Sequence, residues 1–276
     1  MALPDGPVNF YHSSAPVFPG PSSDGDKSKG AILTFKAPVD SPSLIHRYDV
    51  VARTWTNSSV QVLVPRRYGI DAVTDPHSGL VYLLGGYNTW LLDHMAVYDP
   101  HLDTLSSEAL SNEKGSDQAQ ILGLAFYSAA WVPSLDQIIY VGGNSDNFPN
   151  KTTATIELYS PEKVQWTSVI TTGDVPQSID SACLVIDEAR RQAVLFGGSG
   201  QAHDSNQIFF LDLNPESDSV FRWTQGFSTN SLPYNYFLVL DTESVGKVNN
   251  TIGEHQAPVI YDIITKQWVD KYNPLA

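Results

Sequence analysis

The chain has 276 residues, of which 42% are apolar and 17% are charged, so it can bury a large core and does not have the composition of a disordered protein. Its 16 Lys and Arg against 30 Asp and Glu give a formal net charge of −14. Because so acidic a chain repels phosphate backbones, nucleic acid is excluded as an expected partner.

Membrane insertion is also not expected. No apolar run approaches the roughly 20 residues of a spanning helix, and the first residues lack the basic end and apolar stretch of a signal peptide. A single cysteine, Cys183, excludes an internal disulfide. The compartment stays open, although three Asn-X-Ser/Thr sequons favour an extracellular or cell-surface location over the cytoplasm. The glycosylation candidates are Asn57, Asn150 and Asn249.

The chain repeats one series of four short strands. The opening strand of each unit contains small residues, which suit a crowded innermost position. Its copies are expected at residues 11–17, 68–73, 127–132, 180–185 and 234–239.

The second strand is apolar and ends in paired glycines, as in residues 80–86, 137–143 and 192–198. This pattern predicts a buried strand that finishes at a close backbone approach or a turn. Aligning the preceding turn, residues 75–81, with residues 26–32 and 241–248 locates degenerate copies in the first and last units. There Lys36 and Ile252 replace the first glycine.

The third and fourth strands share one marker, an aromatic or apolar residue usually followed by Asp, with Trp or once Leu seven places on. One copy is stretched by an insertion. Because these residues recur at a fixed place, packing between the units explains them better than ligand contact. The copies are Tyr48 with Trp55, Tyr98 with Leu105, Tyr159 with Trp166, Leu211 with Trp223, and Tyr261 with Trp268.

Five units account for nearly all of residues 1–276 as a single domain, with repeats at about 8–60, 61–115, 120–170, 176–228 and 231–272. One such sheet cannot bury both faces, but twisted sheets stacked around an axis can. The sequence therefore predicts an all-β propeller of five four-stranded blades. Since all five units run in phase, three alternatives stay open: the ring closes by packing alone, residues 4–9 add an edge strand, or the chain is part of a larger propeller.

The double glycine followed by a spaced Tyr and Trp resembles the kelch repeat family. The resemblance rests on Gly85-Gly86 with Tyr98, and on Gly142-Gly143 with Tyr159 and Trp166. It covers most of the chain and implies a kelch-type β-propeller, the fold shared by the central propeller of galactose-oxidase-like copper-radical oxidases.

The oxidase chemistry of those relatives is not expected in this chain. It requires a cysteine joined to a tyrosine, together with histidine ligands. Cys183 lies in an inner strand, where a small buried residue is the simpler interpretation, and the histidines lack paired metal-ligand spacing. We expect neither a metal nor a cofactor.

Candidate binding residues lie in the loops that break the repeat, chiefly after the glycine strands, which should emerge on one face. For each of them the alternative is a residue that only solvates a turn. The candidates are Arg66, Arg67, Tyr68, Tyr87, Asn88, Trp90, His94, Asn144, Asp146, Asn147, His203 and Asp204.

These patterns favour a non-enzymatic scaffold that binds a protein or a carbohydrate through loops on one face, with no catalytic residues assigned. A carbohydrate would use Trp90, Tyr87 and the Asn and Asp side chains. A protein would use a flatter surface with Phe148 and the arginines. The alternative is a propeller enzyme, an oxidase or hydrolase, whose site converges only in three dimensions.

Overall fold

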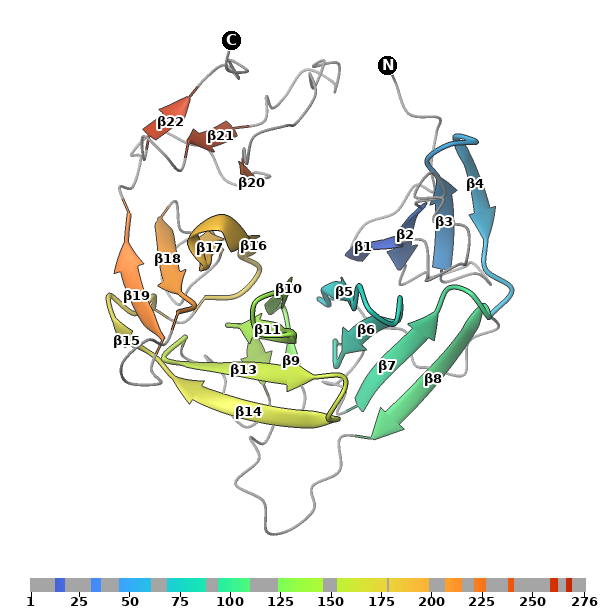
Figure 1. Ribbon diagram of the computed structural model, residues 1–276, viewed down its shortest axis with the longest axis horizontal. Coiled ribbons are helices and arrows are strands. Elements are labelled where there is room, and N and C mark those ends of the chain that lie inside the picture. Colours follow the sequence, from blue (N-terminus) through green and yellow to red (C-terminus); the bar gives the residue numbers. More distant parts are fainter. Residues whose placement is uncertain are drawn as a thin grey trace.

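The computed structural model describes residues 13–17, 31–35, 45–60, 69–87, 94–109, 124–145, 153–177, 179–198, 207–214, 221–226, 238–240, 259–262 and 267–269, and the structural statements below concern these residues. They form small, mostly antiparallel β-sheets and one short 3-10 helix, Glu188–Arg190. The sheets follow one another around a central axis, which makes the fold an all-β, propeller-like arrangement (Figure 1).

Four sheets each contain four antiparallel strands paired in chain order, one of them with a fifth, short strand at its edge, and we number these four-stranded units blades 1 to 4. Blade 1 contains β1 (Ser13–Val17), β2 (Ala31–Phe35), β3 (Ile45–Asp49) and β4 (Thr54–Asn57). Blade 2 contains β5 (Ala72–Thr74), β6 (Val81–Leu84), β7 (His94–Asp99) and β8 (Thr104–Ala109). Blade 3 contains β10 (Ser128–Val132), β11 (Gln137–Val141), β13 (Thr155–Ser160) and β14 (Gln165–Ile170). Blade 4 contains β16 (Cys183–Asp187), β17 (Gln192–Phe196), β18 (Ile208–Asp212) and β19 (Arg222–Gln225).

Two short pairings involve the connections that lead from one blade to the next. β15 (Thr172–Gly173), from the connection between blades 3 and 4, adds to blade 4 by pairing in parallel with β19. β9 (Leu124–Ala125), which precedes blade 3, pairs with β12 (Asn144–Ser145), which follows the glycine pair of that blade. The connections between blades therefore take part in the sheets.

The structure shows four four-stranded blades, not the five predicted. The fifth unit appears as a three-stranded sheet of β20 (Leu238–Leu240), β21 (Val259–Asp262) and β22 (Gln267–Val269). In a complete blade the first and third strands run the same way on either side of the second. Here β20 pairs directly with β21 in parallel, as expected when nothing separates them. The predicted glycine strand around Ile252 lies outside the described residues, as does Lys36.

The Tyr and Trp marker positions face each other across the outer hairpin of every unit. A spacing of seven residues is therefore a register, in which the two side chains lie on the same face of the sheet. The directly opposed pairs are Tyr48 with Trp55, Tyr98 with Leu105, Tyr159 with Trp166, Leu211 with Trp223, and Tyr261 with Trp268.

The Asp of the marker fixes the turn between these two strands. Asp49 Oδ1 accepts hydrogen bonds from the backbone N–H groups of Val51 and Ala52, at 2.9 and 2.7 Å. Arg53 then takes a left-handed backbone with φ +55° and donates its N–H to the Asp49 carbonyl. Asp99 accepts the same pair of bonds in blade 2. A short polar side chain that satisfies the turn explains why Asp recurs here.

The core lies between the blades, as the repeat predicted. On β11, alternate residues face opposite neighbours: Ile138 and Tyr140 pack with blade 2, whereas Ile139 and Val141 pack with blade 4. Of the marker residues, Tyr48, Tyr98, Tyr159 and Trp223 are buried, and Trp55 and Trp166 are half-buried. The Tyr159 ring lies 5.7 Å from the ring of Tyr82 in the preceding blade.

The first strands of the blades lie side by side at the centre, β1 with β5, β5 with β10, β10 with β16, and β16 with β20. In blade 4, Cys183 at the start of β16 pairs with Phe196 at the end of β17. The inner strands thus begin where the glycine strands end, and we call this side of the molecule the loop edge. The opposite side, with the turns β5–β6 and β10–β11, is the turn edge.

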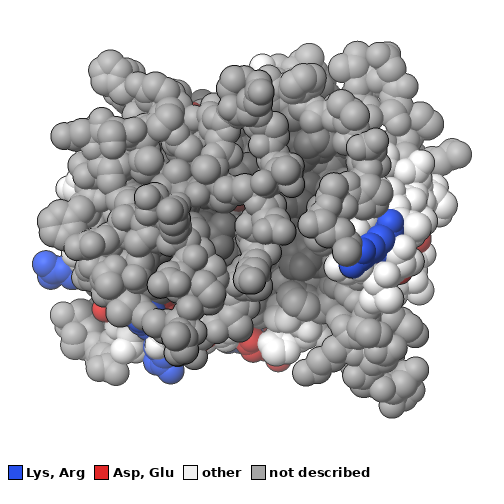
Figure 2. All heavy atoms as spheres, turned by 90° about the horizontal axis from the view of Figure 1, so that it is seen from above, with Lys and Arg blue, Asp and Glu red and all other residues white. Residues whose placement is uncertain are grey.

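Seen from above, the acidic and basic side chains of the described residues lie in separate small groups rather than in one patch of either sign (Figure 2). Within the same residues, no helix has the length and apolar character required to cross a membrane.

Candidate functional site

The glycine pairs hold the segment that leads into the next blade. The N–H of Gly86 donates to the Leu124 carbonyl at 2.8 Å, and one blade on, the N–H of Gly143 donates to the Ile179 carbonyl at 3.0 Å. A Cβ on Gly142 would stand only 2.2 Å from the same Ile179 oxygen. The pair is thus required for close backbone contact, and it positions the lead-in segments at the loop edge.

Three equivalent residues at the loop edge are bonded from blade to blade. Gly69, Phe126 and Ser181 precede the inner strands of blades 2, 3 and 4 and have φ of +66°, +59° and +55°. The N–H of Phe126 donates to the Gly69 carbonyl at 2.6 Å, and the N–H of Ser181 donates to the Phe126 carbonyl at 2.7 Å. Left-handed backbone is costly for Phe and Ser, so the surrounding bonds must hold them in place.

Phe126 lies over Gly69, because a Cβ on that glycine would stand 2.8 Å from the phenyl ring. Asn144 pairs with Ala125 in the β9–β12 ladder, and its Nδ2 donates to Asp180 Oδ2 at 2.9 Å. Asp180 and Phe126 are half-buried, whereas Ser181 is exposed. We call Gly69, Phe126, Asn144, Asp180 and Ser181 the rim cluster.

Three residues predicted for the site lie at the loop edge. Asn144 belongs to the rim cluster. Tyr87 follows the glycine pair of blade 2, and His94 opens β7, where its carbonyl accepts the N–H of Gly85 at 3.0 Å. The other predicted site residues lie outside the described residues and stay predictions: Arg66, Arg67, Tyr68, Asn88, Trp90, Asp146, Asn147, His203 and Asp204.

Sequence reasoning missed Phe126, Asp180 and Ser181. At the position that is Gly69 in the second unit, the next two units have Phe126 and Ser181. A non-glycine residue at such a position indicates local constraint, but that the backbone is left-handed there is visible only in the structure.

A half-buried carboxylate lies next to the rim cluster, in the seam between blades 2 and 3. Asp71 Oδ2 accepts the N–H of Ala129 at 2.9 Å, and the Tyr127 hydroxyl donates to the Leu84 carbonyl at 2.8 Å. Burial raises the pKa of Asp71 to about 6, although the Ala129 hydrogen bond lowers it. Tyr140 is fully buried in the same seam, and burial raises the pKa of its hydroxyl well above the usual value.

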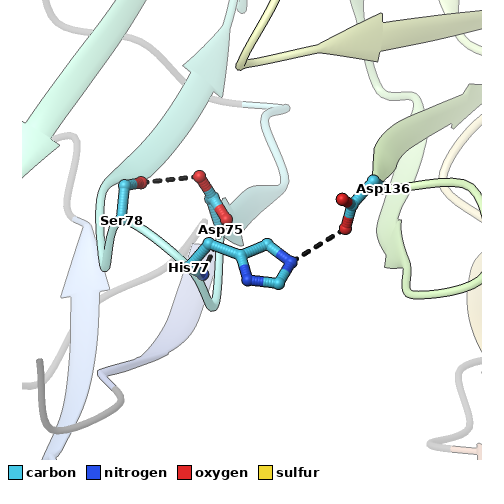
Figure 3. A network of polar contacts seen from close by, with 4 residues as sticks. All are labelled: Asp75, His77, Ser78 and Asp136. Carbon is cyan, nitrogen blue, oxygen red and sulfur yellow. Dashed lines mark hydrogen bonds and ion pairs between the residues drawn. The ribbon is translucent and has the colours of Figure 1, made fainter. Parts of the chain in front are cut away.

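A polar network on the turn edge contains Ser, His and Asp side chains but no catalytic pairing (Figure 3). Asp75 accepts the Ser78 hydroxyl at 2.6 Å and the backbone N–H of His77 at 2.8 Å, so its carboxylate stabilises its own turn. The His77 ring instead contacts Asp136 of blade 3 at 2.8 Å, and this hydrogen bond raises the pKa of His77. The histidine is therefore not directed at the serine hydroxyl.

The part of the chain that the structure describes offers no cluster of metal ligands. No three His, Cys, Asp or Glu side chains of that part gather closely enough to hold a metal ion. Cys183, the first residue of β16, is half-buried rather than fully buried.

Comparison with known proteins identifies the fold and nothing finer. No family model matches the sequence, and no curated protein matches it. Solved structures do match, 238 chains in all. One of them, the structure of YjhT, aligns with 83% of this chain and 68% of its own, with a TM-score of 0.60 and 14% sequence identity. At that identity the likeness extends to the architecture alone: the chain has a β-propeller fold.

Proposed function

We propose that this chain is a kelch-type, non-enzymatic scaffold that binds a carbohydrate at the rim cluster of its loop edge. The observation that carries the proposal is the convergence of an aromatic ring, an amide and a carboxylate on one rigid backbone frame. Phe126, Asn144 and Asp180 come from three separate segments, and the hydrogen bonds described above join them.

The chemistry of these groups suits a polyhydroxylated ligand. A sugar ring presents an apolar face, which packs on an aromatic ring, and hydroxyl groups, which carboxylates and amides bind at their edges. Asn144 donates to one carboxylate oxygen of Asp180, which orients the group and leaves Oδ1 to accept from a ligand hydroxyl. Hydrogen bonds to an ionised acceptor are the stronger class.

The frame is preorganised. Phe126 is fixed by backbone bonds to Gly69 on one side and to Ser181 on the other, so ligand binding needs little ordering of the chain. Tyr87 and His94 lie at the same edge and would extend the site toward blade 2. The protein-binding alternative would need a broader flat surface at this edge, and no described group favours it.

Ring closure by a fifth blade is part of the proposal. On blade 1, Ile32 pairs with Tyr48 and is 40% exposed, whereas the equivalent residues Val81, Ile138 and Ala193 are each 0% exposed because the preceding blade covers them. The first and last sheets, β1–β4 and β20–β22, follow each other around the ring, at the upper right and the upper left of Figure 1. We propose that the fifth unit, predicted at residues 231–272, forms the blade that packs against Ile32 when the ring is closed.

A glycan array followed by calorimetry with the best glycan tests the binding proposal. The wild-type chain should bind at least one glycan class, and F126A and D180N should each weaken binding about tenfold to a hundredfold, through lost ring contact and lost charge. H77A is the matched control, because it removes a polar contact between blades 2 and 3 at the turn edge. It should bind like the wild type.

Two results would overturn the proposal. One is an array with no glycan bound by correctly folded protein. The other is unchanged affinity in F126A and D180N, which would move the site away from the rim cluster. A protein captured at the loop edge instead of a glycan would favour the protein-binding alternative.

A further inference from the structure

The sequon at residues 57–59 forms the outer corner of blade 1. Asn57 is the last residue of β4, the outermost strand of that blade, and its side chain is exposed. A modification here projects from the circumference of the propeller, away from the rim cluster at the centre. Among the sequon asparagines, Asn57 is the one that lies within the described residues.

A neighbouring histidine orients the amide of Asn57. His46 is opposite Asn57 in the β3–β4 ladder, and its Nδ1 lies 2.7 Å from Asn57 Oδ1. His46 is 8% exposed, so the carboxamide oxygen is anchored on the sheet. The amide nitrogen Nδ2, the atom to which N-linked sugars attach, is left on the solvent side.

The hydroxyl residues of the sequon are engaged in the folded chain. Ser58 Oγ donates to Asp103 Oδ1, and Ser59 donates both its N–H and its Oγ to Asp103 Oδ2, at 2.7 and 2.6 Å. Recognition of a sequon requires the hydroxyl of its third residue, here Ser59. That hydroxyl is accessible before the contact with blade 2 forms and is occupied afterwards.

We propose that Asn57 is an N-glycosylation site that accepts its sugar before blades 1 and 2 fold together. The donor class is an oligosaccharide linked to a lipid pyrophosphate. Asn57 Nδ2 forms a bond to the anomeric carbon and loses one proton, the bond from that carbon to the pyrophosphate oxygen breaks, and the lipid pyrophosphate leaves. Folding then places the glycan at the outer corner of blade 1, where it leaves the central rim uncovered.

Glycopeptide mapping of the protein isolated from its source organism tests the modification. Trypsin releases residues 54–66, and this peptide should carry the mass of a glycan. N57Q and S59A should lose the glycan, whereas S58A should keep it. S58A is a close control, since each serine variant removes a side-chain bond to Asp103 and only S59A destroys the sequon.

An unmodified peptide from the source organism, or a glycan that survives S59A, would overturn the proposal whatever the result of the glycan array. The order of events has a separate test. A purified oligosaccharyltransferase should glycosylate the peptide of residues 54–66 but not the folded, unmodified chain. Equal rates on both substrates would show that the Asp103 contact does not protect the sequon.

Discussion

The Tyr98 hydroxyl donates to Asp103 Oδ1 at 2.8 Å, across the outer hairpin of blade 2. The same carboxylate takes the bonds from Ser58 and Ser59 at the end of blade 1. The Asp103 side chain therefore links the two strands of its own hairpin and also binds blade 2 to the end of blade 1. Burial raises the pKa of Tyr98, and the bond to Asp103 raises it further, so the phenol stays a donor at ordinary pH.

Replacement of Asp103 by Asn should weaken the contact between blades 1 and 2. Although burial raises the pKa of Asp103, the bonds from Ser58, Ser59 and Tyr98 together hold it at about 2. Since the unfolded pKa is higher, the carboxylate stabilises the fold above about pH 4, and this contribution is lost as the pH falls through about 2. We expect D103N to lose about 1 to 3 kcal/mol at pH 7 in urea unfolding.

The control for D103N is D99N, which removes a carboxylate that accepts the N–H groups of His101 and Leu102 within its own turn. The gap between D103N and the wild type should narrow as the pH is lowered from 6 toward 3. A gap that stays constant over this range would show that the charge of Asp103 is not the stabilising feature.

Asp71 should have the opposite pH dependence. Its folded pKa of about 6 lies above the ordinary value of 3.8, because burial disfavours the charged form. The neutral carboxyl therefore supports stability below about pH 4, and this support is lost as the pH rises through about 6. D71N keeps an oxygen for the Ala129 N–H and should be about 1 to 3 kcal/mol more stable than the wild type at pH 8.

Thermal unfolding of D71N and wild type across pH 4 to 8 measures this effect. The two melting temperatures should converge near pH 4. A D71N variant that is less stable than the wild type at pH 8 would mean that the carboxylate makes a stabilising contact when ionised.

The glycine pair of blade 3 should tolerate no Cβ. Gly142 and Gly79 have similar left-handed backbones, with φ of +69° and +75°. A Cβ on Gly142 would meet the Ile179 carbonyl at 2.2 Å, whereas on Gly79 it would meet the movable His101 ring at 3.2 Å. G79A should cost about 1 kcal/mol, from backbone strain alone, and G142A clearly more, because the lead-in segment at Ile179 must move away from the glycine strand. Equal losses of unfolding free energy in urea would contradict the close-approach explanation.

The effect of an Ile32 substitution on the free energy of unfolding tests whether a fifth blade closes the ring. If residues 231–272 cover it, I32A removes buried methyl groups and should cost about 1 to 3 kcal/mol. V51A is the control, since Val51 lies on a turn and is 64% exposed. It should change the free energy of unfolding by less than about 0.5 kcal/mol. An I32A variant as stable as V51A would leave blade 1 uncovered and argue against closure by a fifth blade.

Much of the architecture could be predicted because the spacing of the marker residues reflects the register in which two strands pair. The seven-residue spacing of Tyr98 and Leu105 is a cross-strand pair, so finding the marker amounts to finding the hairpin. The inner strands were placed less well: β5 begins at Ala72 instead of Tyr68, and β16 at Cys183 instead of Asp180. Gly69 and Ser181 turn into left-handed backbone, which no strand can continue through.

The rim cluster could not be predicted from spacing. Asn144 was selected as a loop residue after a glycine pair, but its partner Asp180 follows 36 residues later in the lead-in to the next blade. Their contact depends on how two blades stack, which no local pattern records. Phe126 was passed over because one aromatic residue before an inner strand carries no signal until its backbone is known.

The parallel pairing of β15 with β19 has a consequence for solubility. Backbone bonds from Thr172 and Asp174 to Phe221 and Trp223 occupy the outer edge of blade 4, and the Trp223 indole N–H donates to Thr171 at 3.1 Å. An unpaired sheet edge is a template on which a second molecule can add a strand and begin aggregation. The connection between blades 3 and 4 thus also covers this sheet edge, so that a strand of a neighbouring molecule cannot pair with it.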